Sequence, residues 1–264
     1  MPTSPHTDPD PQPAFGSSTF GKDLQRMFGA MSPRYSMFDH VSTFGGDFIW
    51  RPRALWHADR LLEHPPFRIL DVGCGPGDLT LLLPQHYPTA YVVGLDFTRE
   101  MVERAAGNAA ARREGRATFV RGDALRLPFP DGSFDLVTSA FLLRNLPDLA
   151  RGFREMARVL RPGGVLLALD VTEPGPGAFG RFFHAYFDTV VPAIGNAFGF
   201  GGASRYLSKS IRQVPPRPQV VTLLSAAGFA PALAETQWMG IVTGYFGRRP
   251  PAEVSSPVVS PGKA

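Results

Sequence analysis

Short apolar runs alternate with longer amphipathic segments through the middle of the chain. The apolar runs have the length of strands, and the segments between them have the length of helices or turns. The predicted strands are residues 68–72, 91–96, 117–123, 136–141 and 165–171, and the predicted helices are 78–86, 98–114 and 148–160. Strands separated by helix-length segments indicate βαβ units, so we expect a parallel sheet with helices on both faces.

The pattern changes after residue 171. A segment rich in phenylalanine and glycine is followed by a predicted helix at 218–228 and two predicted strands at 229–238 and 240–248. Two consecutive strands at the end of a parallel sheet favour an antiparallel hairpin. The expected fold is an α/β, Rossmann-like, mostly parallel sheet of seven strands that finishes in this hairpin.

The phenylalanine-rich segment carries an apolar stripe at helical spacing. Its members are Phe179, Phe182, Phe183, Tyr186, Phe187, Val190, Val191 and Ile194. Such a stripe either packs on the sheet as core or forms the wall of a site for an apolar ligand. The spacing leaves both interpretations open.

The composition is that of a folded globular protein. The chain has 264 residues, 44% hydrophobic and 19% charged, which suits one large domain. Proline-rich ends predict disordered tails at 1–20 and 250–264, with a single domain over 21–249. The single cysteine, Cys74, excludes an internal disulfide. The N-terminal stretch lacks the features of a signal peptide and no run of 18 apolar residues occurs, so we expect a cytoplasmic protein.

The net charge of +4 favours an anionic partner without specifying it. The arginines are scattered, and no run of five or six like charges occurs. We therefore expect no nucleic-acid partner, whereas weak attraction to an anionic membrane surface is consistent with the charge.

Three glycines crowd the turn after the first predicted strand. Gly73, Gly75 and Gly77 follow Asp71, and in an open α/β sheet this turn presents backbone N–H groups to a ligand that lies against the main chain. A nucleoside triphosphate would need a Lys and a Ser or Thr after the last glycine, and a dinucleotide would need a glycine at position 78, which is Asp. The pattern DxGxGxG fits S-adenosylmethionine instead, because its ammonium group attracts carboxylates.

Acidic residues end the next two predicted strands. Asp96 can accept hydrogen bonds from both ribose hydroxyls, and Asp123 can accept one from the adenine amino group. Ala124 and Ala140, beside the third and fourth strand ends, belong to the same predicted cofactor-binding set. The alternative is that both aspartates only cap the helices that follow them.

These motifs and several later stretches resemble the ubiquinone/menaquinone biosynthesis C-methyltransferase family, within the class I S-adenosylmethionine-dependent methyltransferases. The stretches are YSMFDHVSTFG from Tyr35, LRNLPDLARGFREMARVLRPGG from Leu143, RYLSKSIRQVPPRPQVVTLLSAAGF from Arg205, and the ending GIVTGYFGRRP. Together they cover roughly residues 30–249. The chain departs from the family pattern at Ser36, where Asp is common, and at Ala140, where Ser is frequent.

The resemblance implies methyl transfer from sulfur to a ring carbon of a prenylated quinol, with no metal. Arg144 would stabilise a developing phenolate, and Asn145 would orient the hydroxyl. The alternative for Arg144 is a surface ion pair with a carboxylate such as Asp148. The candidate proton acceptors are Tyr35, His184, Asp123 and a water bound by Arg144.

The resemblance also divides the domain into a cofactor-binding core at 67–172 and an apolar insertion at 173–212 that covers the substrate. The glycines and aromatics of the insertion suggest a lid. Demethylmenaquinol is the expected substrate. A ubiquinol precursor, another small lipophilic acceptor and a non-catalytic scaffold role are the alternatives. Peripheral contact with the inner face of the membrane is expected, and a homodimer is left open.

Overall fold

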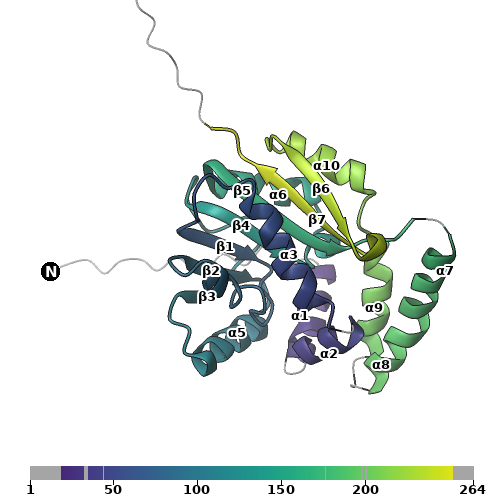
Figure 1. The fold of residues 1–264 in the computed structure, drawn as a ribbon. Helices are drawn as coiled ribbons and strands as arrows, with labels where there is room; N and C mark the ends of the chain where they lie inside the picture. The colour runs from purple at the N-terminus through teal and green to yellow at the C-terminus, as the bar shows by residue number, and fades with distance from the viewer. Residues whose placement is uncertain are drawn as a thin grey trace, which may run out of the picture.

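The computed structural model describes residues 19–32, 35–43, 45–175, 177–197, 199 and 201–251. At its centre lies a seven-stranded sheet in the order β3-β2-β1-β4-β5-β7-β6 (Figure 1). The strands are β1 (Arg68–Val72), β2 (Tyr91–Asp96), β3 (Ala117–Arg121), β4 (Phe134–Ala140), β5 (Leu160–Val171), β6 (Ala232–Gln237) and β7 (Val242–Arg248). β1 to β5 pair in parallel, and β7 runs antiparallel to β5 and β6. The predicted parallel sheet with a C-terminal hairpin is confirmed.

Helices cover both faces of the sheet because side chains alternate along the buried strands. Ile69 of β1 packs into one core cluster with α3 (Asp47–Asp59). Its neighbour Leu70 packs into a second cluster with α6 (Leu149–Val159) and α10 (Arg217–Ala226) on the opposite face. The order of the strands reverses at β1, so the loops after β1 and β4 face one crevice, which is where ligands bind in this architecture.

The helix predicted at 78–86 is much shorter in the structure. Regular α4 spans only Leu83–His86, and turns occupy the residues before it. A helix through the whole stretch would place Pro84 in its interior, where it lacks the N–H that the helix requires, whereas Pro84 is tolerated in a first turn. The helix predicted at 98–114 is confirmed as α5 (Arg99–Arg112).

Two N-terminal helices precede the sheet. α1 spans Thr19–Met31 and α2 spans Tyr35–Ser42. The first two residues of α1, 19 and 20, fall within the tail predicted at 1–20. The rest of that tail and residues 252–264 of the predicted C-terminal tail lie outside the described residues.

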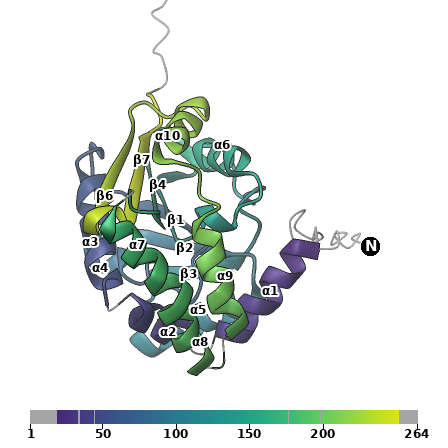
Figure 2. The same cartoon turned by 90° about the vertical axis from the view of Figure 1, so that its right-hand side faces the viewer.

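The apolar segment after β5 is helical. It forms α7 (Ala178–Ala185), a π-helical turn η3 (Tyr186–Val190), α8 (Val191–Ala197) and α9 (Gly201–Ile211). These helices gather with α1 and α2 on one side of the molecule (Figure 2). The helical spacing of the apolar stripe is therefore confirmed.

Candidate functional site

The glycine turn connects β1 to the short α4. Gly73, Gly75 and Gly77 have φ angles of 72°, 54° and 90°, in the left-handed region that favours glycine. A Cβ atom on Gly73 would lie 2.9 Å from the side chain of Leu142, whereas one on Gly75 would meet nothing within 4 Å. Gly75 therefore presents bare backbone to open space, as a turn that receives a ligand must.

Asp71 lies beneath the turn and is buried. Its carboxylate accepts hydrogen bonds from Thr80 Oγ1 at 2.6 Å and Thr138 Oγ1 at 2.9 Å. Burial raises the pKa of Asp71 to about 6, against the lowering effects of the two hydroxyls and of the Arg51 charge. A positive charge placed above the turn would favour the ionised carboxylate.

Asp96 ends β2, as predicted, whereas Asp123 lies two residues beyond the end of β3; both are buried. Asp96 accepts hydrogen bonds from the Thr98 N–H at 2.8 Å and the Gly75 N–H at 3.0 Å, so it joins β2 to the glycine turn. Burial raises the pKa of Asp96. Asp123 accepts from the Leu125 N–H at 2.8 Å, and a turn rather than a helix follows it. The capping alternative describes neither aspartate, because the N-cap of α5 is Thr98 and no helix follows Asp123.

A small crevice of about 30 Å³ opens beside the glycine turn. It is lined by Tyr35, Arg51, Asp71, Gly73, Cys74, Gly75, Pro76, Asp78, Leu79, Ala140 and Phe141. Helix α2 is tied to the turn because Ser36 Oγ donates to the Asp78 carboxylate at 3.0 Å. Four predicted cofactor residues, Asp71, Gly73, Gly75 and Ala140, thus meet Tyr35 at one place. Gly77, Asp96, Asp123 and Ala124 do not line this crevice, and Ala124 is buried in the core cluster around α6.

Arg51 was missed by the sequence analysis. It comes from α3, and its Nη1 lies 2.7 Å from Asp47, a carboxylate that also contacts His40 at 2.7 Å. Both Arg51 and Asp47 are buried, so the arginine is held in place beside the crevice. The only local signal was the spacing of Asp47 and Arg51, which lie four residues apart and so share one face of a helix such as α3.

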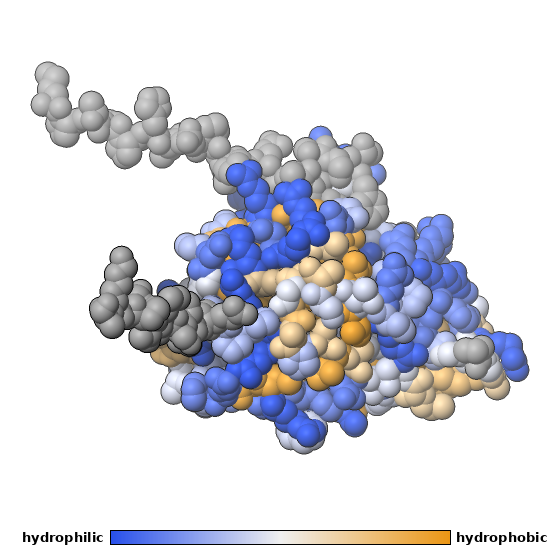
Figure 3. Space-filling view, turned by 90° about the horizontal axis from the view of Figure 1, so that it is seen from above, coloured by the Kyte–Doolittle hydropathy of each residue, from blue (hydrophilic) through white to orange (hydrophobic). Residues whose placement is uncertain are grey.

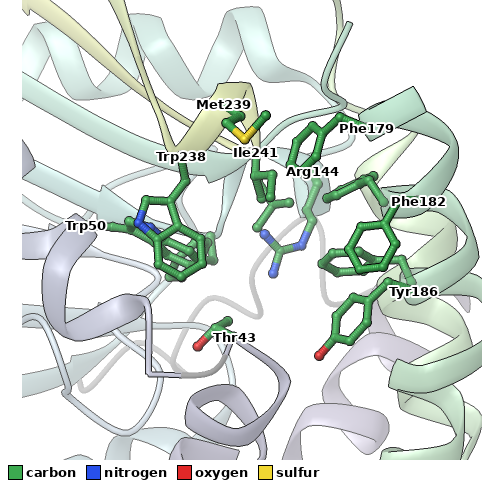
Figure 4. A pocket seen from close by; sticks show the side chains of 13 residues that line it. Thr43, Trp50, Arg144, Phe179, Phe182, Tyr186, Trp238, Met239 and Ile241 are labelled. Atoms are coloured by element: carbon green, nitrogen blue, oxygen red, sulfur yellow. The ribbon is translucent and has the colours of Figure 1, made fainter. Parts of the chain in front are cut away.

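A larger cavity of about 460 Å³ adjoins the crevice (Figure 4). Its lining residues are Thr43, Trp50, Phe141, Arg144, Val171, Phe179, Phe182, Phe183, Tyr186, Phe187, Trp238, Met239 and Ile241. Phe141 lines both spaces, so a ligand in one lies next to a ligand in the other. The lining is almost wholly apolar, and Arg144 contributes its cationic group (Figure 4).

The apolar stripe serves as both cavity wall and core. Phe179, Phe182, Tyr186 and Phe187 line the cavity, whereas Phe183 lines it and is also buried in the core cluster around α3. The two further phenylalanines at positions 198 and 200 lie outside the described residues. The two interpretations of the stripe are therefore both partly right.

Arg144 lies in the 3₁₀ turn η2 (Leu143–Asn145) after β4 and is buried. Its Nη1 forms an ion pair with Asp170 Oδ1, and its backbone N–H donates to Asp170 Oδ2 at 3.2 Å. Asp148 was the wrong partner, because it caps α6 by accepting from the Arg151 N–H at 2.8 Å. Asp170 stands at the end of β5, beside the end of β4, and its buried carboxylate outcompetes an exposed one.

Asn145 and His184 do not line the cavity. The Asn145 amide donates to the Phe141 carbonyl at 3.3 Å and accepts from the Tyr206 hydroxyl at 2.9 Å, so it holds the turn against α9. His184 is 41% exposed on α7, with its Nε2 3.9 Å from the Glu173 carboxylate. Tyr35 lines the crevice and not the cavity.

Among the described residues, no group of three or more His, Cys, Asp or Glu side chains could hold a metal ion. Within that same part of the chain, no helix combines the length and apolar character needed to cross a bilayer.

Residues 18–249 match the model of the ubiE/COQ5 methyltransferase family. A demethylmenaquinone methyltransferase of Thermus thermophilus is 41% identical over 225 residues, which are 85% of this chain and 100% of that protein. A ubiquinone/menaquinone biosynthesis C-methyltransferase of Geobacter sulfurreducens is 36% identical over 87% of this chain and 89% of its own length.

The fold is also found in solved structures. A SAM-dependent methyltransferase from Aquifex aeolicus superposes with a TM-score of 0.53 at 17% identity, covering 74% of this chain and 89% of that one. The predicted class I methyltransferase fold is confirmed.

Proposed function

Because the chain belongs to the ubiE/COQ5 methyltransferase family, we propose that it methylates a ring carbon of a prenylated quinol, demethylmenaquinol in the first instance. The resemblance predicted from the motifs and the class of S-adenosylmethionine-dependent methyltransferase are confirmed. The observation that carries the substrate proposal is the contact of two sites, a glycine-turn crevice and an apolar cavity, through Phe141. We also propose a single methyltransferase domain over 21–249, with the insertion 173–212 covering the substrate.

The residues of the crevice fit S-adenosylmethionine. Gly75 leaves room for a ligand against the main chain, and Arg51 is available to attract the methionine carboxylate, while Asp71 favours the ammonium group. Asp96 and Asp123 would hold the ribose and the adenine at the neighbouring strand ends, with Ala124 packed beneath. When bound, the cofactor supplies an electrophilic methyl group on its sulfonium sulfur.

The cavity suits a quinol ring with an apolar tail. A cavity of this size holds a drug-sized ligand, and its aromatic walls on α7 and η3 match a prenyl chain. Arg144 lies at the turn next to Phe141, where its charge would lower the pKa of a quinol hydroxyl and stabilise the phenolate. Loss of that proton makes the neighbouring ring carbon nucleophilic.

Asn145 and Asp170 would act through other groups. Asn145 fixes the Phe141 backbone, and Asp170 fixes the Arg144 guanidinium that faces the cavity. The water bound by Arg144 is our preferred proton acceptor, because His184 pairs with Glu173 outside the cavity lining and burial raises the pKa of the cavity hydroxyl of Tyr186. Positioning of the ring then contributes most of the rate.

The test is to incubate the protein with S-adenosylmethionine labelled in its methyl group and with reduced demethylmenaquinone, and to extract the lipid. Label in the quinone, lost in Arg144→Ala but not in the surface variant Arg154→Ala, supports the proposal. Cofactor binding without label in the lipid contradicts it. Parallel reactions with a ubiquinol precursor and with short-tailed phenols identify another acceptor, and no label in any of them leaves a scaffold role.

The proposal extends to location. A substrate with a prenyl tail resides in a bilayer, so we propose a cytoplasmic protein in peripheral contact with the inner face of the membrane. Whether it works as a homodimer is tested by sedimentation of the purified protein.

A further inference from the structure

Helix α3 carries an apolar stripe on its outer face. Phe48, Ile49 and Trp56 are all exposed, although the opposite face of the helix buries Trp50 and Ala54 in the core. The exposed three fall within about 100° of the circumference of a helix with 3.6 residues per turn. The helix is therefore apolar both toward the core and toward the outside.

A second exposed apolar group stands at the edge of the cavity. Phe182 of α7 and Trp238 and Met239 of η4 (Trp238–Gly240) line the cavity and are exposed as well (Figure 4). The Trp238 ring meets the Trp50 ring edge-on with centroids 5.3 Å apart, so η4 packs directly on α3. We call the two groups together the apron; its members are Phe48, Ile49, Trp56, Phe182, Trp238 and Met239, which are between 43% and 74% exposed.

Exposure alone would not distinguish the apron. Folded proteins expose many single apolar side chains, and Figure 3 shows hydrophobic residues among hydrophilic ones on the face seen from above. The apron differs because three of its members also line the 460 Å³ cavity. Whatever covers these three side chains is therefore continuous with the ligand of the cavity.

Two arginines lie beside the α3 part of the apron. Arg53 is exposed on the outer face of α3, and Arg60 lies over the Trp56 ring, 5.2 Å from its centroid. The nearby Asp59 contacts His86 at 2.9 Å and accepts from the Tyr87 hydroxyl at 2.6 Å. Aromatic side chains flanked by arginines are typical of protein surfaces that enter the headgroup region of a bilayer.

On the premise of the proposed function, we propose that the apron docks on an anionic lipid bilayer and opens the cavity toward it. Its aromatic and aliphatic side chains enter the headgroup boundary, and Arg53 and Arg60 pair with lipid phosphates. A prenylated quinol then passes from the bilayer into the cavity without exposing its tail to water. No helix that spans the bilayer is required for this arrangement.

The test measures partition of the full chain onto vesicles of phosphatidylglycerol and phosphatidylcholine, and onto vesicles of phosphatidylcholine alone. The double variant Phe48→Ser, Ile49→Ser leaves the cavity lining intact and is expected to bind the anionic vesicles about tenfold more weakly than wild type. Phe67→Ser is the matched control, because Phe67 is 55% exposed and lies ahead of β1, outside the apron. The control is expected to bind as wild type does.

Charge is tested separately. Arg53→Glu with Arg60→Glu is expected to weaken binding to anionic vesicles by about tenfold or more, and added salt should abolish the difference from wild type. Binding of wild type to phosphatidylcholine vesicles as tight as to anionic ones would overturn the role of the arginines.

Activity separates this proposal from the proposed function. Methylation of demethylmenaquinol in vesicles should fall in the Phe48, Ile49 double variant in step with binding, while methylation of a short-tailed quinol in solution stays unchanged. Equal vesicle binding of the double variant and wild type would overturn docking while leaving the function intact. Normal docking without methylation of any quinol would overturn the function instead. A change from dimer to monomer in the double variant, with vesicle binding unchanged, would assign the apron to a second copy of the chain and overturn the lipid proposal.

Discussion

The crevice and the cavity meet at Phe141, but they are built in different ways. The crevice is formed largely by one stretch of chain, residues 71–79, whose backbone angles and hydrogen bonds determine its shape. The cavity takes its walls from segments far apart in the sequence, among them α3, η3 and η4. The crevice is thus a product of local backbone geometry, whereas the cavity depends on how distant helices pack. The two regions should therefore respond differently to single substitutions.

The largest effect is expected at the boundary between the two regions. Asp170→Asn leaves the Arg144 guanidinium buried without its counter-charge, which should cost about 3 kcal/mol of unfolding free energy. Asp148→Asn, at the partner suggested by sequence alone, should cost only about 0.3 kcal/mol or less, because Asn caps a helix about as well as Asp does. Urea denaturation of both variants measures the difference. Equal losses of unfolding free energy in the two variants would mean that the buried Arg144–Asp170 pair does not hold the two regions together.

The next effect concerns the pH dependence of the crevice. The pKa of Asp71 is raised from 3.8 to about 6 in the folded protein, so the folded state binds more protons than the unfolded state between those values. Stability should therefore fall as pH rises from about 4 to 6, by up to ~3 kcal/mol from this group. Denaturation at pH 4, 5, 6 and 7 should reveal a larger loss in wild type than in Asp71→Asn, which keeps only the contribution of other groups such as the buried Asp96. A variant that follows the wild-type curve would show that Asp71 is ionised throughout.

The third effect sharpens the contrast in backbone geometry. Gly75→Val leaves a side chain in open space in the free protein, with a strained φ of 54° that should cost about 1–2 kcal/mol. Where a cofactor lies against the turn, the same side chain should weaken binding of S-adenosylmethionine by about a hundredfold, or ~2.7 kcal/mol. Calorimetric titration measures the affinity. Gly107→Ala is the control, since its Cβ also meets nothing within 4 Å, but in the regular helix α5. A similar affinity for S-adenosylmethionine in Gly75→Val and wild type would mean that the cofactor does not bind against this turn.

The difference between the regions also explains what the sequence could predict. The crevice followed from motif spacing because glycine positions and strand ends are local features, and Asp71, Gly73 and Gly75 line it together. Arg51 escaped prediction because its place beside the turn depends on how α3 packs across the sheet. Asp170 escaped for the same reason: β4 and β5 are neighbours in space, but residue 170 is 26 positions from Arg144.

The cavity shows the limit more clearly. The helical spacing of the segment after β5 was visible in the sequence, and so was its excess of phenylalanine. Nothing in that spacing indicates that Trp238 and Met239 of η4 complete the same wall. Trp238 is the last residue of the strand predicted at 229–238, and Met239 lies between that strand and the next predicted one. His184 illustrates the converse: it was a candidate for the site but lies outside the cavity lining. Its position along the turn of α7 directs its side chain to Glu173.

The smallest expected effect tests the packing of the cavity itself. Phe179→Ala truncates a side chain that lines the cavity and belongs to neither the apron nor the buried core clusters. The loss of contact with an apolar tail should raise KM for a long-tailed quinol about fivefold, or ~1 kcal/mol, with little change in KM for a short-tailed analogue. Cofactor affinity should stay at the wild-type value, because the crevice does not contain Phe179. Steady-state kinetics with both quinols decide the matter. Equal KM changes for the two substrates would place the tail outside the cavity. The separate construction of crevice and cavity implies that they act independently. A parallel loss of cofactor affinity in Phe179→Ala would contradict that independence.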